Sequence, residues 1–346
     1  MKLKENAGII LGHSICLIIL IISFIGRDSL FVTKTQEEAI EKKMVSIITT
    51  APISSEEVIT SEETPAITPT SVPIATPTII PTPTTEVVIP PNPPEPTNTP
   101  KQQVLKNIEQ GVYATLGNSL ENWWFIRKLN QVPSGSGEAF DISEYGGMYR
   151  NKQVQSEDKV IYLTLDCGYG NLYTKQLLDI FKKYDVKVTF FVTNYYLEVS
   201  EAEVKRMVEE GHKVANHSAT HAKLPTCTEE KMYQEIVGCE EAFYEITGQE
   251  MAKFFRPPEG SYSKKTMQIT KDLGYKTVFW SIAYKDYDIN NQPGKEYVLD
   301  HFKTYHHNGA IVLMHNDSKS NLEAMEEVLL FLIGEGYRFG TLDEIP

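Results

Sequence analysis

Asp166 and Cys167 are adjacent residues whose side chains could supply a proton acceptor and a soft metal ligand at one place. They follow the apolar run 160–165, which predicts a buried strand, and Gly168 comes next. Three more polar clusters also lie at or just after short apolar runs: His217 with His221, Arg256 with Pro257, and His315. Loops at one end of a sheet are therefore expected to bring these clusters together.

The spacing of two histidines, together with the neighbouring clusters, predicts a catalytic metal site. His217 and His221 are four residues apart, which on a helical turn places both rings on one face. Such a pair alone is weak evidence, because surface helices carry it by chance. Two imidazoles, one ligand from the 166–167 pair and an open position for water are the pattern of a catalytic rather than a structural zinc. We expect one divalent metal ion, with Zn²⁺ favoured, and Cys167 either as a thiolate ligand or as a protonated thiol while the two histidines and water hold the metal.

The other clusters suggest acid–base chemistry, each beside a plainer interpretation. Asp166 is either a turn residue or a general base that takes a proton from metal-bound water as the water attacks a carbonyl. Arg256 is either a solvated charge or the group that keeps Asp166 ionised and oriented. His315 either caps a buried strand or acts as the general acid for a leaving nitrogen. In the second case Asp286 would raise its pKa and fix its tautomer.

Strand-like and helix-like runs alternate after residue 159, which indicates parallel strands joined by helical crossovers. The predicted fold is a distorted (β/α) barrel of about seven parallel strands, because the site residues follow several different strands. The predicted strands are 160–165, 187–193, 212–216, 252–256, 275–280, 310–314 and 337–341. The predicted helices are 173–184, 200–210, 229–247, 263–273, 295–306 and 320–335.

The first hundred residues have a different composition. Residues 7–26 are almost wholly apolar and follow Lys2 and Lys4, which predicts a transmembrane signal anchor after a cytoplasmic segment, 1–6. A lipid on Cys16 is the disfavoured alternative, since Ile15 is too large for that site. The expected localisation is the cell membrane, single-pass, with the catalytic domain extracytoplasmic. Thirteen of the 19 prolines lie in 51–100, so 27–100 is predicted to be a disordered linker.

The rest of the chain is long enough for one well-buried domain. We divide it into an N-terminal extension, 101–158, and a catalytic domain, 159–346. The chain carries a formal net charge of −13, and this negative balance extends to the catalytic body, which argues against a nucleic-acid partner.

The ordered motifs resemble those of the polysaccharide deacetylases, carbohydrate esterase family 4, also called the NodB-homology domain. The matching segments are 163–169, 216–221, 255–260, 280–287 and 313–315. The resemblance implies a distorted barrel and a divalent metal, usually zinc. It also implies the roles above: Asp166 as base, His217 and His221 as ligands, Arg256 orienting the base, His315 as acid and Asp286 tuning it. Pro257, Tyr287 and Trp280 are the candidate substrate-binding residues.

A closer subgroup also fits, namely the peptidoglycan N-acetylmuramic acid deacetylases that prepare muramic δ-lactam in the spore cortex, which implies a role in sporulation or in cell-wall modification. Segments 124–125, 130–133, 168–171 and 289–292 carry this likeness. Two positions depart from the wider family: Cys167 stands where a second, metal-binding Asp is usual, and Tyr287 replaces a frequent Trp. The first departure bears on the identity and affinity of the metal, and the second on the floor of the sugar pocket.

Three functions follow as hypotheses. The first is a monomeric, metal-dependent hydrolase that removes N-acetyl groups from peptidoglycan glycan strands, at muramic acid. The second keeps the chemistry but acts on N-acetylglucosamine polymers or on xylan. The third, of another class, is an inactive, membrane-anchored wall-binding module that has lost its metal through Cys167.

Overall fold

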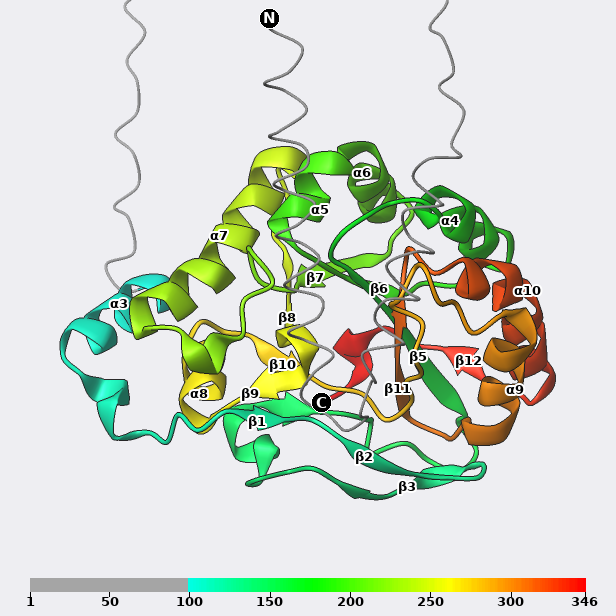
Figure 1. The fold of residues 1–346 in the computed structure, drawn as a ribbon, viewed down its shortest axis with the longest axis horizontal. Helices are drawn as coiled ribbons and strands as arrows, with labels where there is room; N and C mark the ends of the chain where they lie inside the picture. The colour runs from blue at the N-terminus through cyan, green and yellow to red at the C-terminus, as the bar shows by residue number, and fades with distance from the viewer. Residues whose placement is uncertain (1–98) are drawn as a thin grey trace, which may run out of the picture. The chain divides into compact units, whose positions relative to one another are not determined.

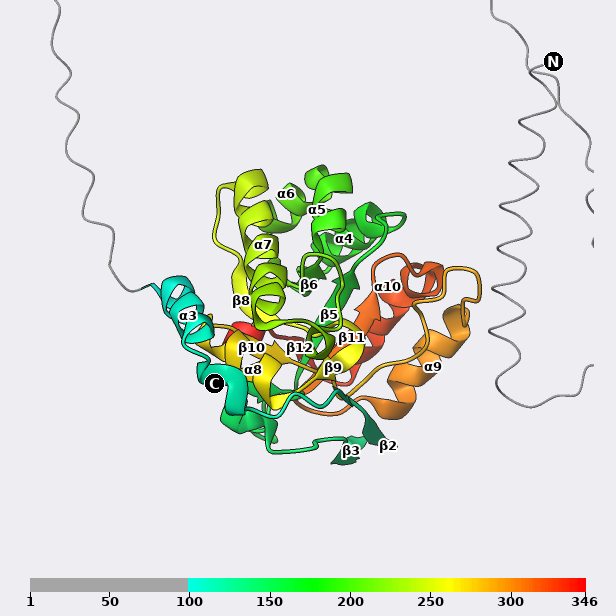
Figure 2. The same cartoon turned by 60° about the vertical axis from the view of Figure 1, so that its left-hand side comes forward.

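The computed structural model describes residues 99–346 (Figure 1). The predicted anchor, 7–26, lies outside the described residues, and so does the predicted linker apart from its last two residues. In the described part, helices surround a curved sheet, as the two views in Figures 1 and 2 show.

The central sheet has eight strands, and every pairing in it is parallel. Their order is β11-β5-β6-β7-β8-β10-β4, with β12 also paired to β5. The predicted parallel α/β architecture is confirmed, and each predicted strand matches an observed one to within two residues at either end. The strands are β4 (Gly147–Met148), β5 (Val160–Cys167), β6 (Thr189–Val192), β7 (Lys213–Asn216), β8 (Ala252–Phe255), β10 (Lys276–Val278), β11 (Ala310–His315) and β12 (Arg338–Phe339).

The sheet curls into an incompletely closed barrel. Within residues 99–346, no continuous ladder joins β11 to the β10–β4 side. Two single bridges span this gap, Ile282 with Val312 and Arg150 with Ala310. The predicted barrel is therefore distorted at this seam, where the chain leaves β10 and runs beside β11.

Seven helices follow these strands around the outside of the barrel (Figure 2). Six of them were predicted, and each begins and ends within one residue of the prediction. The seventh, α5, was missed because six residues are too few for a helical pattern to show. The helices are α4 (Thr174–Lys183), α5 (Asn194–Val199), α6 (Glu201–Glu209), α7 (Glu229–Thr247), α8 (Lys264–Asp272), α9 (Lys295–Tyr305) and α10 (Lys319–Gly334).

Local sequence signals explain why these helix boundaries were predictable. In α7 the Thr228 hydroxyl accepts a hydrogen bond from Lys231 N, which caps a first turn that carries two glutamates. Gly248 ends the helix in the left-handed conformation, at φ 66°. Ser263 and Ser318 cap α8 and α10 in the same way.

Strand β5 is buried along its whole length, and its side chains alternate between two apolar clusters. Ile161, Leu163, Leu165 and Cys167 belong to the large cluster between the sheet and the helices. Val160 and Tyr162 belong to a smaller cluster with residues of the neighbouring strands and the C-terminal segment. This alternation gives the last two residues of β5 opposite directions, which decides the roles open to each.

The segment before β5 packs onto the same body. Helix α3 (Pro100–Glu109) buries Val104 and Ile108 in a cluster with residues of α7 and α8. Trp123 stacks on Phe279 and donates a hydrogen bond from its indole Nε1 to Trp280 O at 2.9 Å. The short strands here are β1 (Glu121–Asn122), paired with β9 (Ser261–Tyr262), and the hairpin β2 (Phe125–Lys128) with β3 (Gln131–Ser136).

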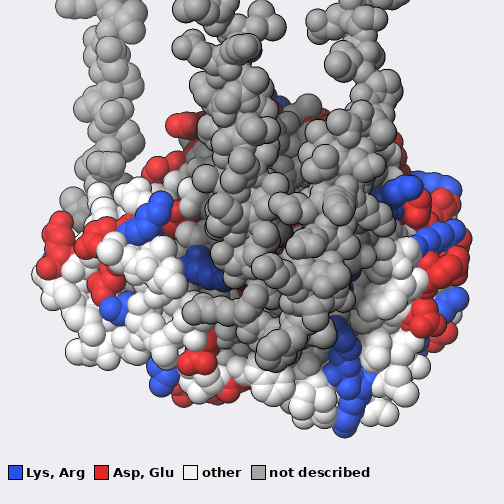
Figure 3. Space-filling model, in the orientation of Figure 1, with Lys and Arg blue, Asp and Glu red and all other residues white. Residues whose placement is uncertain are grey.

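On the visible described surface, acidic and basic side chains are interspersed (Figure 3). Ion pairs such as Lys295 with Glu327, between α9 and α10, account for part of this mixture. Both charge signs therefore occur on the part of the described surface that is visible in this view.

The predicted single-pass membrane localisation is corrected. None of the helices in residues 99–346 is both long and apolar enough to cross a bilayer. The longest, α7, has 19 residues but carries charged side chains, and the others are shorter than the span of about 20 residues that a bilayer needs. The apolar run that motivated the prediction lies outside the described residues.

Candidate active site

Four strands deliver the polar clusters to one end of the barrel. Asp166 is the penultimate residue of β5 and His315 is the last residue of β11, and the two lie directly opposite each other in the register of these paired strands. His217 and Arg256 follow β7 and β8, and Arg256 N donates to Asn216 O at 2.9 Å across that pair. Because all these strands are parallel, their C-terminal ends coincide.

Asp166 is a buried carboxylate held by a buried arginine. Its Oδ1 accepts from Arg256 Nη1 at 2.7 Å, and its Oδ2 lies 3.4 Å from His217 Nε2. Burial alone would raise the pKa of Asp166, but the charge of Arg256 and the nearby His217 outweigh it and lower this pKa below its ordinary value. Asp166 is thus ionised and keeps Oδ2 available for a proton.

Arg256 is fixed from three sides and has no exposed surface. Besides Asp166, it donates from Nε to Val278 O at 3.3 Å, and its guanidinium lies 4.1 Å from the centre of the Phe191 ring. Trp280 lies further away, at 5.8 Å from the same group. The arrangement suits the predicted orienting role, since Arg256 has little freedom to leave Asp166.

His217 and His221 lie close together, with ring centroids 4.9 Å apart. His217 Nδ1 is 2.8 Å from Arg256 O, which can only accept, so Nδ1 carries the hydrogen and Nε2 is left with its lone pair. Burial lowers the pKa of His217 to about 4 and also lowers the pKa of His221. Both rings are therefore neutral at neutral pH, the state in which imidazole binds metals.

The segment between the two histidines is a loop, not the helical turn expected from their spacing. Ser218 and His221 have φ values of 67° and 59°, in the left-handed region that non-glycine residues seldom adopt. Glu235 of α7 anchors the loop: its carboxylate accepts from Thr220 N at 2.8 Å and from Thr220 Oγ1 at 2.7 Å. Glu235 is fully buried, and the sequence analysis missed it because it lies on a separate helix.

His315, which is partly exposed, forms a second pair with the fully buried Asp286. Its Nδ1 is 2.8 Å from Asp286 Oδ1, and its backbone N donates to Asp286 Oδ2 at 2.8 Å. Burial would lower the pKa of His315, but Asp286, with smaller contributions from Asp166 and Asp317, raises it to about 9. His315 is consequently protonated at neutral pH and faces the site as an acid.

The donors present fit a divalent metal ion through the two imidazoles. His217 is neutral, and its ring is oriented by a carbonyl at Nδ1, as in many metal sites. Across residues 99–346, no group of three or more His, Cys, Asp or Glu side chains is arranged to hold a metal. The protein's donor set at this point is therefore His217 and His221, with Asp166 beside them.

Cys167 lies elsewhere. Its side chain is fully buried in the large apolar cluster, on the face of β5 that packs against the helices. Burial, followed by the charge of Asp166, raises the pKa of the thiol well above its ordinary value. The structure therefore gives Cys167 the environment of a core residue.

Two exposed tyrosines lie beside the site histidines. Tyr287 is 60% exposed, and its ring centroid is 6.0 Å from that of His315, which suits the predicted contact with substrate. Tyr169, which was not predicted, is 68% exposed and places its hydroxyl 3.3 Å from His221 Nδ1. Pro257 is buried behind Arg256, a position from which it shapes the backbone more readily than it meets substrate.

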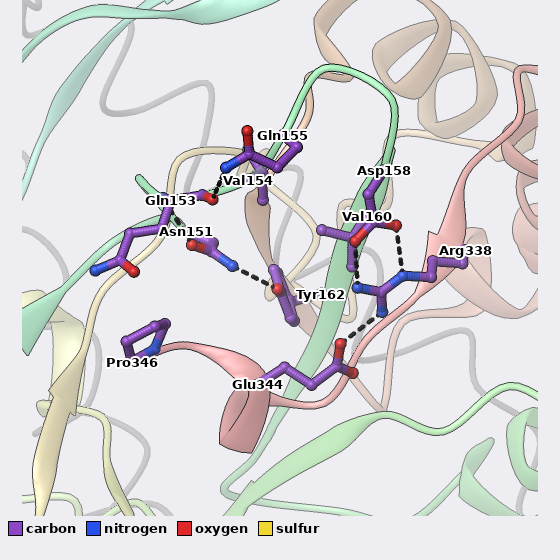
Figure 4. Close-up of a pocket in the computed structure, with 10 residues that line it drawn as sticks. All are labelled: Asn151, Gln153, Val154, Gln155, Asp158, Val160, Tyr162, Arg338, Glu344 and Pro346. Carbon is purple, nitrogen blue, oxygen red and sulfur yellow. Dashed lines mark hydrogen bonds and ion pairs between the residues drawn. The ribbon is translucent and has the colours of Figure 1, made fainter.

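A different pocket lies at the opposite end of β5 (Figure 4). Arg338 donates to both oxygens of Asp158, at 2.7 and 2.8 Å, and also to Glu344. Tyr162 accepts at its hydroxyl from Asn151. The charged groups that line this pocket, Arg338, Asp158 and Glu344, are paired with one another, and none of the predicted site residues lines it.

Comparison with known proteins agrees with the motifs. The family model described as polysaccharide deacetylase matches residues 153–278. The peptidoglycan-N-acetylmuramic acid deacetylase PdaA of Bacillus subtilis is 40% identical over 226 residues, which cover 65% of this chain and 85% of that protein. A peptidoglycan-N-acetylglucosamine deacetylase of Bacillus cereus is 31% identical over 200 residues, 57% of this chain and 92% of that protein.

Solved structures give the same result. The structure of Bacillus subtilis PdaA, a family 4 carbohydrate esterase, matches with a TM-score of 0.63 and 39% identity, covering 66% of this chain and 98% of that one. A family 4 carbohydrate esterase of Bacillus anthracis matches with a TM-score of 0.56 and 33% identity, covering 67% and 98%. The chain belongs to the polysaccharide deacetylases, carbohydrate esterase family 4, a family of hydrolases that act on acetyl groups.

Proposed function

We propose that this protein hydrolyses the N-acetyl group of muramic acid residues in peptidoglycan glycan strands. The observation that carries the proposal is that Asp166 and His315 lie opposite each other in the register of the adjacent strands β5 and β11. Their surroundings move the two pKa values apart, below the ordinary value for Asp166 and up to about 9 for His315. A base and an acid that coexist at neutral pH are what amide hydrolysis requires.

The side chains divide the reaction between them. Asp166 Oδ2 takes the proton of the attacking water, while Arg256 holds Oδ1 and keeps the carboxylate oriented. His315 gives its Nε2 proton to the departing amine nitrogen, and Asp286 stabilises the imidazolium through Nδ1 until then. A divalent ion bound by His217 and His221 would polarise the acetyl carbonyl and the water. Tyr287 and Tyr169 are exposed beside His315 and His221, where an amino sugar can pack against an aromatic face.

The choice of muramic acid rests on the relatives. PdaA, at 40% identity, is named for N-acetylmuramic acid, whereas the Bacillus cereus relative, at 31%, is named for N-acetylglucosamine. The greater identity and coverage of this chain by PdaA favour the first sugar. Deacetylation of N-acetylglucosamine polymers remains the second candidate.

Product analysis tests the substrate. The purified protein is incubated with peptidoglycan glycan strands, released acetate is measured, and the digested strands are analysed by mass spectrometry. We expect acetate together with muramic residues that lack acetyl groups, some of them cyclised to the δ-lactam. Acetyl loss confined to glucosamine would move the assignment to the second candidate.

Metal content tests the inactive alternative. We expect about one equivalent of a divalent ion, loss of acetate release on chelation, and recovery when Zn²⁺ is returned. Protein that binds no metal and releases no acetate under any metal would support the non-catalytic reading instead.

A further inference from the structure

Asp286 has a hydrogen-bond partner beyond His315. Asn321, in the first turn of α10, donates from Nδ2 to Asp286 Oδ2 at 2.7 Å. The same amide nitrogen donates to His315 O at 3.0 Å. One buried amide therefore touches both members of the His315–Asp286 pair, and Asn321 has no exposed surface.

Tyr284 fixes the direction of that amide. Its hydroxyl is 2.8 Å from Asn321 Oδ1 and donates to it. Because the amide oxygen is occupied by this donor, the amide nitrogen must face Asp286. Tyr284 is itself buried among aromatic rings, with His301 at 4.9 Å and Tyr297 at 6.3 Å between centroids. This packing holds the Tyr284 ring in place, so its hydroxyl is a fixed donor to the Asn321 amide.

The loop that carries Asp286 is fastened to the same end of α10. Gln292 donates from Nε2 to Asp286 O at 2.8 Å and to Asp288 O at 2.9 Å. Its Oε1 accepts from Ser318 Oγ at 2.6 Å and from Ser320 N at 3.1 Å. The backbone of Asp286 is therefore held independently of Asn321, so the amide acts on the carboxylate, where it shares Oδ2 with the backbone N of His315.

We propose that Asn321 is a positioning residue that, with Tyr284 behind it, holds the Asp286 carboxylate in line with His315. Without the amide, Asp286 Oδ2 keeps only the hydrogen bond from His315 N, so the carboxylate can turn further about its last torsion and interact with the His315 ring less effectively. The inference rests on the proposed role of His315 as general acid. It adds two residues, from α10 and from the β10–α9 connection, to the machinery that keeps this acid protonated.

The test compares three variants of the full chain. Asn321→Leu removes the amide at similar volume, and Tyr284→Phe removes only the hydroxyl that orients it. Tyr297→Phe is the matched control, since it removes a hydroxyl from the same aromatic cluster outside the hydrogen-bond chain. The backbone N of Asn321 is capped by Ser318 Oγ whichever side chain is present, so α10 keeps its first turn. Thermal melting checks that each variant is folded.

The first measurement needs no substrate. The His315 pKa is read by NMR titration of histidine-labelled protein, with His315→Gln used to assign the signal. We expect this pKa to fall from about 9 toward its ordinary value by one unit or more in Asn321→Leu, and by less in Tyr284→Phe. Asp166 and Asp317, which also face His315, are unchanged in every variant. Tyr297→Phe should titrate like the parent protein.

The second measurement is kinetic, with peptidoglycan strands as substrate. For Asn321→Leu we expect kcat to fall about tenfold with KM within about twofold, because the acid acts in the chemical step. A His315 pKa that stays constant or rises in folded Asn321→Leu overturns the proposal. If that variant does not fold, Tyr284→Phe decides, and equality with Tyr297→Phe overturns it. Failure of peptidoglycan deacetylation as such would appear in the parent protein and leave the NMR result standing.

Discussion

The two ends of the barrel hold two arginine–carboxylate pairs that differ in almost every physical respect. At the C-terminal end of β5, Arg256 and Asp166 are buried, and a single hydrogen bond joins them. At the N-terminal end, Arg338 donates hydrogen bonds to both oxygens of Asp158 and to Glu344 (Figure 4). About half of each of these side chains is exposed. In the exposed pair both carboxylate oxygens of Asp158 accept from Arg338, whereas in the buried pair only one oxygen of Asp166 accepts from Arg256.

The unsatisfied atoms distinguish the functional pair. Asp166 keeps Oδ2 for a proton, and Arg256 Nη2 has no hydrogen-bond partner among the described residues. A buried charged group with an unpaired hydrogen-bonding atom destabilises the fold, unless a substrate, water or ion binds to that atom. The charged atoms of Arg338 and Asp158 at the N-terminal end of β5 are paired with one another, so the comparison assigns chemistry to one end and structure to the other.

Asp166→Asn should have the largest effect on activity. The variant keeps the shape of the side chain but cannot take the proton of the water, so we expect acetate release to fall by about 10²–10⁴-fold. Circular dichroism should show an unchanged fold. Asp158→Asn, the matched change at the other end, should retain the parent rate. Comparable activity of Asp166→Asn would remove the base assignment.

Arg256→Met should have the next largest effect, and it acts on stability as well. The change leaves Asp166 buried without its counter-ion, so we expect a loss of about 3–5 kcal/mol in the free energy of unfolding, measured with urea. Arg338→Met gives the comparison, because solvent screens that pair and its loss should cost far less. Similar losses in the two variants would contradict the distinction drawn between the two ends.

The pH dependence should report His315. Because the acid must be protonated, kcat/KM should decline as pH rises through about 9. The raised pKa also means that the His315–Asp286 pair contributes full stability below the ordinary histidine value of about 6.5, and loses it as pH rises from there through about 9. Melting curves between pH 6 and 10 should show this loss, and His315→Gln should lack it. An alkaline limb that persists in His315→Gln belongs to another group.

Much of this arrangement could be predicted because it depends on short stretches of sequence. The apolar runs, the threonine and serine caps and the terminal glycines set the strands and helices nearly residue by residue. Parallel pairing then places the ends of β5, β7, β8 and β11 together. Asp166, His217, Arg256 and His315 meet for this reason, without any information on their distances.

The parts that could not be predicted depend on partners far apart in the chain. The left-handed turn at His221 is held by Glu235 of α7, and Asp286 is held by Asn321 of α10. No local pattern marks these partners, so the H-x-x-x-H spacing was wrongly taken for a helical turn. The direction of the Cys167 side chain, in contrast, could have been predicted. Neighbouring side chains along a strand point to opposite faces of the sheet, so if Asp166 points toward the site, Cys167 points toward the helices.

Cys167→Ala should have the smallest effect, and it tests that alternation directly. The thiol packs in the large apolar cluster, so its removal should lower the free energy of unfolding by about 1 kcal/mol, as for other small core deletions. Acetate release and bound metal should stay within about twofold of the parent protein, because the two imidazoles remain. His217→Ala provides the contrast, since it removes one of those donors and should reduce bound metal sharply. If Cys167→Ala instead lost its metal while remaining folded, the thiol would have to turn toward the histidines in the metal-bound protein, and β5 would present both of its last residues to the site.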